Sequence, residues 1–218
     1  DSLKPFKRVK RMLRRNSNAR DKVLSQEQFN AMLEALPRHA KPIFAMAYYT
    51  GMRKGEILGL TWEKVDLDKK VVRLAAEDTK DREPRVIPLC GELCAMLDAI
   101  PRPIHDDHVF LFRGKPIKEI KEALMNACEK VGLVYGRRHR DGFTFHDLRH
   151  CFNTNMRRAG VPESVIMRIT GHATKEMFYR YDTVDDRDKR NAVDQMLTQL
   201  SGGEAVDMGG AVDREEKC

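Results

Sequence analysis

The chain has 218 residues, of which 41% are hydrophobic and 7% are aromatic, and its formal net charge is +7. This composition is typical of a globular protein with a packed core, and a chain of this length forms one or two domains. No apolar run approaches the roughly 20 residues that a membrane-spanning helix needs, and no secretion signal is visible. Because the chain begins with Asp1 instead of Met, we expect a fragment or a processed form of a longer protein.

The positive charge is concentrated at the start of the chain. Residues 1–20 contain eight Lys or Arg side chains against the single acid Asp1. This excess matches the net charge of the whole chain, so residues 1–22 are predicted to form a basic arm or interdomain linker. Such an arm is consistent with a polyanionic partner, although a solvated linker without a partner explains the charge equally well.

Cysteine usage indicates a reducing environment. The chain has five cysteines, an odd number without a paired spacing, which is typical of reduced cytosolic thiols. Cys90 and Cys94 could share one helix face, but there is no second ligand pair, so packing in the core is favoured over zinc binding.

Hydrophobic spacing predicts a mainly helical chain with one small sheet. Ser25 caps a first helix, with Gln28 in a capping box, and Pro37 ends it. A second, apolar helix runs from Pro42 to a C-terminal glycine, Gly51. Residues 62–89 contain short β-like runs at 71–74 and 85–89, and the segments 66–70 and 78–84 are predicted to be turns between strands. This pattern indicates a three-stranded antiparallel sheet, in which Pro88 fits only at an edge or an end.

Helices are expected to continue after the sheet, and residues 101–116 are expected to be mostly loop. The predicted helices span residues 91–100, 117–131, 145–159, 162–170, 173–181 and 186–200. Residues 201–218 are Gly-rich and acidic, which predicts a flexible tail. The fold class is therefore α+β, mainly α, with one helical domain at 23–200.

The segment TFHDLRHCF at 144–152 contains several helix-start signals. Thr144 is the predicted N-cap with Asp147 at the third helical position, and His146 would lie in the first turn. Free N–H groups and the positive end of the helix dipole favour an anion there. Arg149, one turn further on, can donate two hydrogen bonds to a phosphate. A surface histidine beside a solvated arginine is the alternative for this segment by itself.

Three other segments supply polar groups that are unremarkable one by one. TGMRKGE places Arg53 after a glycine turn, TKDREPRVIPL places Lys80 in a β-turn, and GHATKEMFYRY places His172 after Gly171 and Tyr181 nine residues later. A helix ion pair between Arg53 and Glu56, a solvated lysine and packed aromatic rings would explain these segments without any activity.

Together and in this order, the blocks resemble the catalytic domain of the tyrosine recombinases, the phage integrase family, especially integrases of prophages and genomic islands. The resemblance covers residues 24–200. It implies a catalytic set of six side chains, which are Arg53, Lys80, His146, Arg149, His172 and Tyr181. It also implies that a small N-terminal DNA-clamping domain precedes residues 1–22 in such enzymes. Tyr179 is the alternative nucleophile, but its spacing from His172 fits less well.

The resemblance implies cutting and rejoining of DNA through a covalent 3′-phosphotyrosyl intermediate, without a metal, ATP or another cofactor. A covalent link stores the phosphodiester energy during exchange. Arg53, Arg149 and His172 would stabilise the phosphate oxygens. Lys80 would protonate the leaving oxygen, and His146 would assist the tyrosine or hold the phosphate.

The expected partner is a double-stranded DNA attachment or recombination site in the bacterial cytoplasm. The family implies a homotetramer on DNA, with possible accessory DNA-bending proteins, whereas this fragment alone is expected to be monomeric. Basic residues just before the key helix are predicted to contact the DNA backbone, with a solvated loop as the alternative. They are Arg137, Arg138 and Arg140.

The sequence also allows two other functions and contains one segment of metal-ligand residue types. Residues 149–172 can be read as a helix-turn-helix of a non-catalytic DNA-binding module, which leaves Arg53, Lys80 and Tyr181 unexplained. A topoisomerase would use the same tyrosine chemistry without strand exchange. His105-Asp-Asp-His108 contains metal-ligand types, but it lies in a proline-flanked segment, so metal binding is not expected.

Overall fold

The computed structural model describes residues 23–139, 141–171, 190, 193–194 and 196. The chain divides into two units, residues 1–183 and 184–218. Within the second unit, the four described residues are helical, and the predicted helix at 173–181 and tail at 201–218 lie outside the described residues.

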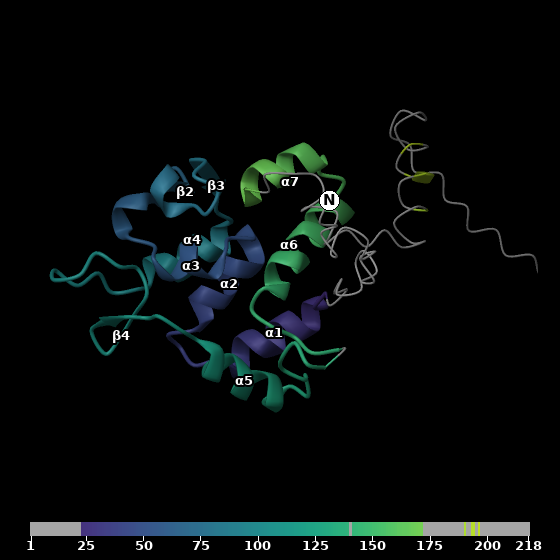
Figure 1. Ribbon diagram of the computed structural model, residues 1–218, viewed down its shortest axis with the longest axis horizontal. Helices are drawn as coiled ribbons and strands as arrows, with labels where there is room; N and C mark the ends of the chain where they lie inside the picture. Colours follow the sequence, from purple (N-terminus) through teal and green to yellow (C-terminus); the bar gives the residue numbers. More distant parts are fainter. Residues whose placement is uncertain (1–22, 140, 172–189, 191–192, 195, 197–218) are drawn as a thin grey trace, which may run out of the picture. The chain divides into compact units, whose positions relative to one another are not determined.

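Helix α2 (Lys41–Thr50) is the centre of the first unit, surrounded by α1 (Gln26–Ala35), α3 (Lys54–Leu58), α4 (Gly91–Asp98) and α6 (Asp147–Arg158) (Figure 1). Seven of its ten residues are buried, as expected for a helix that is apolar on all sides. Gly51 ends it in the left-handed conformation with φ of 64°, which confirms the predicted C-terminal glycine.

The first helix begins at a predicted cap. The Ser25 hydroxyl accepts a hydrogen bond from the Gln28 amide, and the Gln28 side chain accepts one from the Ser25 amide. Phe29 then stacks on Tyr48 of α2, with ring centroids 3.9 Å apart. Because the cap fixes where the helix starts, it also fixes which face of α1 meets α2.

The predicted three-stranded antiparallel sheet is confirmed. Strands β1 (Val65–Asp66), β2 (Val71–Leu74) and β3 (Arg85–Pro88) lie in the order β1-β2-β3, with Val72 opposite Ile87. Pro88 ends β3, and β3 is an edge strand, as its missing N–H requires. Helix α7 (Glu163–Thr170) packs against β3, which brings the C-terminal part of the unit to the sheet (Figure 1).

Residues 101–116 are mostly loop, as predicted, and they include a small hairpin, β4 (Leu111–Phe112) with β5 (Lys115–Pro116). One expected boundary is wrong. Helix α5 (Lys121–Lys130) begins four residues later than predicted, because the Glu119 carboxylate accepts hydrogen bonds from the Ile120 and Lys121 amides and so caps the helix there.

Helix α6 also begins later than predicted. Asp147 is its first residue, and His146 is the N-cap in place of Thr144. The Asp147 carboxylate accepts hydrogen bonds from both the amide and the hydroxyl of Thr144, at 2.6 and 2.8 Å. The Thr144 hydroxyl is therefore a donor to Asp147 and not an acceptor from the helix amides, and His146 stands just before the first turn.

Candidate active site

Arg149 is buried in the middle of the unit, with 3% of its surface exposed. Its Nη1 donates a hydrogen bond of 2.7 Å to the carbonyl oxygen of Gly51. This carbonyl lies at the C-terminal end of α2, where helix carbonyls have no partner within the helix and attract a cation. The contact joins α6 to the glycine turn that leads to Arg53.

Arg53 follows two residues later, at the start of α3. Its amide and Nη1 donate to the Glu56 carboxylate at 2.8 and 3.1 Å. Its Nη2 donates to Asp81 Oδ2 at 2.6 Å and to the Gly171 carbonyl at 3.0 Å. The guanidinium thus connects α3, the turn before β3 and the end of α7. Its contact at the end of α7 is with Gly171, the residue before His172.

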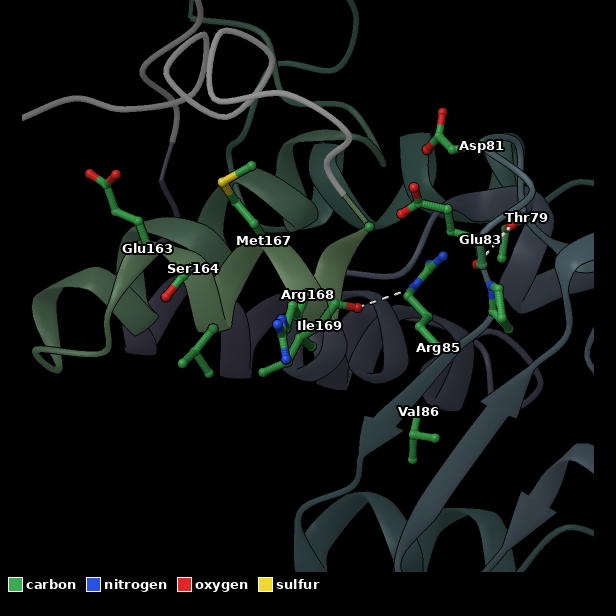
Figure 2. A pocket seen from close by; sticks show the side chains of 13 residues that line it. Thr79, Asp81, Glu83, Arg85, Val86, Glu163, Ser164, Met167, Arg168 and Ile169 are labelled. Atoms are coloured by element: carbon green, nitrogen blue, oxygen red, sulfur yellow. Dashed lines mark hydrogen bonds between the residues drawn. The ribbon is translucent and has the colours of Figure 1, made fainter.

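A second, more deeply buried ion pair supports Arg53. Arg85 Nη2 lies 2.6 Å from Glu56 Oε2, and both side chains are less than a tenth exposed. Arg85 Nε also donates to the Ile169 carbonyl at 3.1 Å (Figure 2). Glu56 is therefore fixed by two arginines, and Arg53 and Arg85 both complement the negative C-terminal end of α7.

His146 lies in the electrostatic field of these arginines. The pKa of its imidazole is lowered, mainly by desolvation and next by the positive charge of Arg149. Arg137 and Arg53 add smaller contributions, and Asp147 opposes the shift. The residue nevertheless keeps exposed surface. A neutral imidazole near two guanidinium groups can accept a proton near neutral pH.

Lys80 lies in the turn between β2 and β3, and it is exposed. Within the described part of the chain, no hydrogen bond or ion pair holds its ammonium group. The turn itself is held on both sides, because the Thr79 hydroxyl donates to the Glu83 carbonyl at 3.1 Å and the neighbouring Asp81 is paired with Arg53. Lys80 is therefore free to move on a turn attached to the site.

Arg137 and Arg138 are exposed in the loop before α6. The loop is closed by two backbone hydrogen bonds, from the Phe143 amide to the Val134 carbonyl and from the Gly136 amide to the Phe143 carbonyl. This closure, together with the effect of Arg137 on the pKa of His146, puts basic side chains beside the candidate site.

A groove of about 1140 Å³ runs between α7 on one side and the turn at 79–84 with the start of β3 on the other (Figure 2). Asp81, Glu83 and Arg85 line one side, and Glu163, Met167 and Arg168 are among the residues of the other. Gly171, whose carbonyl accepts from Arg53, lies at its end. The groove therefore opens beside the arginine cluster.

The structure brings together three of the six predicted catalytic side chains, Arg53, His146 and Arg149, and places Lys80 on a turn tied to them. His172 and Tyr181, the rival Tyr179, and Arg140 lie outside the described residues, so their predicted roles stay predictions. Sequence reasoning missed Asp81 and Arg85. The signal for Arg85 was its place at the start of the segment RVIPL, which follows the lysine turn.

The segment from His105 to His108 makes a local contact. Asp106 Oδ1 lies 2.6 Å from His108 Nδ1. The backbone hydrogen bond from the His108 amide, followed by this side-chain contact, lowers the pKa of Asp106. Over the described ranges, no three His, Cys, Asp or Glu side chains are grouped as metal ligands. Over the same residues, no helix is long and apolar enough to cross a membrane.

The architecture places the chain in a known structural class. It superposes on the crystal structure of XerA recombinase with a TM-score of 0.67 and 22% identity, covering 81% of this chain and 66% of that one. It also matches the Tn1549 transposon integrase in complex with a circular intermediate DNA, with a TM-score of 0.63, 18% identity, and 80% and 66% of the two chains covered. The fold is that of a tyrosine recombinase catalytic domain.

Sequence comparison gives the family. Residues 22–188 match the phage integrase family, so the chain belongs to that family. The tyrosine recombinase XerA of Pyrococcus furiosus is 27% identical over 188 residues, which cover 84% of this chain. The chain spans 65% of the length of that relative. The predicted fold class and family are thereby confirmed.

Proposed function

We propose that this chain is the catalytic domain of a site-specific DNA recombinase or integrase that cuts and rejoins DNA through a covalent 3′-phosphotyrosyl intermediate. The observation that carries the proposal is the joining of Arg149 to the Gly51 carbonyl and of Arg53 to the Gly171 carbonyl. These contacts bring two cationic side chains that are 96 positions apart in the sequence to one site. They also hold Gly171, the residue before His172, at the Arg53 guanidinium. Family membership of residues 22–188 supports the same chemistry.

In the proposed reaction, the Tyr181 oxygen attacks the phosphorus, and the bond from phosphorus to the 5′-oxygen breaks. Arg53, Arg149 and His172 stabilise the negative charge on the nonbridging oxygens. The ammonium of Lys80 gives its proton to the leaving 5′-oxygen. A 5′-hydroxyl of the partner strand then attacks the phosphotyrosyl bond and releases the tyrosine, so no external energy source is needed.

His146 has two proposed roles, and the electrostatic environment of its imidazole favours one of them. Either it accepts the proton of Tyr181, or it holds the phosphate. The lowered pKa of its imidazole favours the role of proton acceptor, because a neutral ring can take up the proton that the tyrosine loses.

The proposed partners are double-stranded recombination sites and further copies of the chain. Exposed Arg137 and Arg138 would contact DNA phosphates beside the active site. Residues 1–22 would act as the basic linker, 23–200 as the catalytic domain and 201–218 as a flexible tail. We propose a homotetramer on DNA in the bacterial cytoplasm, assisted where needed by DNA-bending proteins, and a monomer for this fragment alone.

The test is covalent capture of DNA. The chain is incubated with a nicked duplex of its own recombination site, in which loss of a short fragment prevents religation, in the presence of EDTA and without ATP. We expect a denaturation-resistant adduct, which Arg149→Ala should lower by roughly 10²–10³-fold in rate. A chain that binds the duplex without forming an adduct would favour the DNA-binding module. Relaxation of supercoiled plasmids regardless of sequence would favour a topoisomerase.

A further inference from the structure

The ion pair between Arg53 and Asp81 occupies the group that is proposed to bind the DNA phosphate. Both hydrogens of Arg53 Nη2 are used, one by Asp81 Oδ2 at 2.6 Å and one by the Gly171 carbonyl at 3.0 Å. An aspartate carboxylate and a phosphodiester each carry one negative charge and offer two oxygens to a guanidinium. The Asp81 carboxylate therefore resembles, in charge and in hydrogen-bond acceptors, the DNA phosphate that Arg53 is proposed to bind.

The two carboxylates on Arg53 differ in how firmly they are held. Glu56 accepts hydrogen bonds from the Arg53 amide, from Arg53 Nη1 and from Arg85 Nη2, and its side chain is 3% exposed. Asp81 is 24% exposed, and among the described residues its only hydrogen bond or ion pair is the one to Arg53. Glu56 is a fixed brace, whereas Asp81 can leave at low cost.

Asp81 lies next to Lys80 in the chain, so loss of its contact with Arg53 would also affect the position of Lys80. Asp81 directly follows Lys80, in a turn where Arg82 has a positive φ of 54°. Figure 2 shows Asp81 and Glu83 on this turn, above Arg85 and facing the groove beside α7. As long as Asp81 is paired with Arg53, the turn that carries Lys80 is tied to the site.

We propose that Asp81 is an internal substitute for the DNA phosphate, which holds Arg53 and the Lys80 turn in a resting arrangement until a phosphate displaces it. The inference rests on the proposed function. On DNA binding, the phosphodiester takes over the Arg53 Nη2 hydrogen that Asp81 had accepted, so Asp81 loses its partner and moves away. The turn is then released, and Lys80 can reach the leaving oxygen.

The turn offers a matched control for the test. Asp81→Asn and Glu83→Gln each remove one negative charge from the same turn, but only the first removes the partner of Arg53. Any general attraction of DNA to a less acidic turn should appear equally in both variants. The difference between them isolates the ion pair.

The experiment measures binding of a short fluorescent DNA duplex by anisotropy at low salt, and it needs no strand cleavage. We expect Asp81→Asn to bind about 1.5- to 5-fold more tightly than Glu83→Gln, which is the range for a partly exposed ion pair. The gain should vanish when Arg53→Ala is added to both variants. Without DNA, amide hydrogen exchange in the turn at 79–84 should be faster in Asp81→Asn than in Glu83→Gln.

Three outcomes would overturn the proposal. If Asp81→Asn binds DNA no more tightly than Glu83→Gln, or more weakly, then Asp81 is a permanent brace of Arg53. If the gain persists beside Arg53→Ala, it does not act through that arginine. If neither the parent chain nor any variant binds DNA, the proposed function itself fails, and the substitute has nothing to replace.

Discussion

At the residue scale, both arginines of the site are oriented by carbonyl groups at the ends of helices. Arg149 binds the Gly51 carbonyl after α2, and Arg53 binds the Gly171 carbonyl after α7. Helix ends leave these carbonyls without partners, so each arginine satisfies a group that would otherwise need water. Orientation by the backbone therefore fixes each guanidinium relative to the end of a helix.

The lowered pKa of His146 predicts how stability depends on pH. Its imidazole has a pKa below the ordinary 6.5 in the folded chain, so between these two values the unfolded chain binds more protons. This contribution to the free energy of unfolding should therefore be complete above about pH 6.5. It should decrease as the pH falls from 6.5 towards the pKa of the folded chain. In His146→Gln the slope of the free energy of unfolding against pH should be smaller, as measured by urea denaturation across pH 5–8.

The matched variant for this prediction is His139→Gln, which removes an exposed imidazole from the loop before α6. The comparison corrects for the loss of any histidine. An unchanged slope in His146→Gln would mean that neither desolvation nor the arginines around His146 oppose its protonation.

At the element scale, the glycine turn between α2 and α3 sets the distance between the two arginines. Gly51 has a φ of 64°, and a Cβ there would meet Phe152 Cδ1 at 2.6 Å and Thr170 Cγ2 at 3.0 Å. No side chain fits between α6 and the end of α7 at this point. The turn is therefore a packing requirement for bringing α2, α6 and α7 together.

Gly51→Ala should lower the free energy of unfolding by about 2–5 kcal/mol, because overpacking adds to the strain of a left-handed residue. Gly55→Ala is the control: nothing lies within 4 Å of its Cβ position inside α3, so this change should stabilise the chain by about 0.5–1 kcal/mol. Urea denaturation of the two variants measures both. Equal effects would show that the close contact at Gly51 is relieved without cost.

The elements also show how much could be predicted from the sequence. Ser25 with Gln28, Gly51 and Gly171 marked helix ends correctly, since caps and C-terminal glycines act through neighbouring residues. The start of α6 was wrong because the Thr144 hydroxyl has two possible roles, and only the position of the Asp147 carboxylate decides between them.

For the candidate site, the order of the blocks predicted Arg53, His146 and Arg149, and the fold brings these three side chains together. The pairing of Asp81 with Arg53 joins residues 28 positions apart, and the pairing of Arg85 with Glu56 joins residues 29 positions apart. Neither spacing follows a helix or strand period, so these contacts depend on how the turn before β3 packs on α3 and α7.

At the scale of the whole molecule, DNA binding should depend strongly on salt. Arg137→Ala with Arg138→Ala should lower the slope of log binding constant against log salt by about 1.8, which corresponds to two lost phosphate contacts. Lys115→Ala with Lys118→Ala removes the same charge from exposed positions at the β4–β5 hairpin and just after it, and should change the slope less. Equal slopes would mean that the loop before α6 does not touch DNA.

In the proposed reaction, the phenol of Tyr181 attacks a phosphate that is held by Arg53 and Arg149. Mass spectrometry of the nuclease-trimmed DNA adduct tests this attack most directly, because the residual nucleotide marks the attacking side chain. We predict the nucleotide on Tyr181, with no adduct in Tyr181→Phe and a normal adduct in Tyr179→Phe. A nucleotide on Tyr179, or an adduct that survives Tyr181→Phe, would contradict the account.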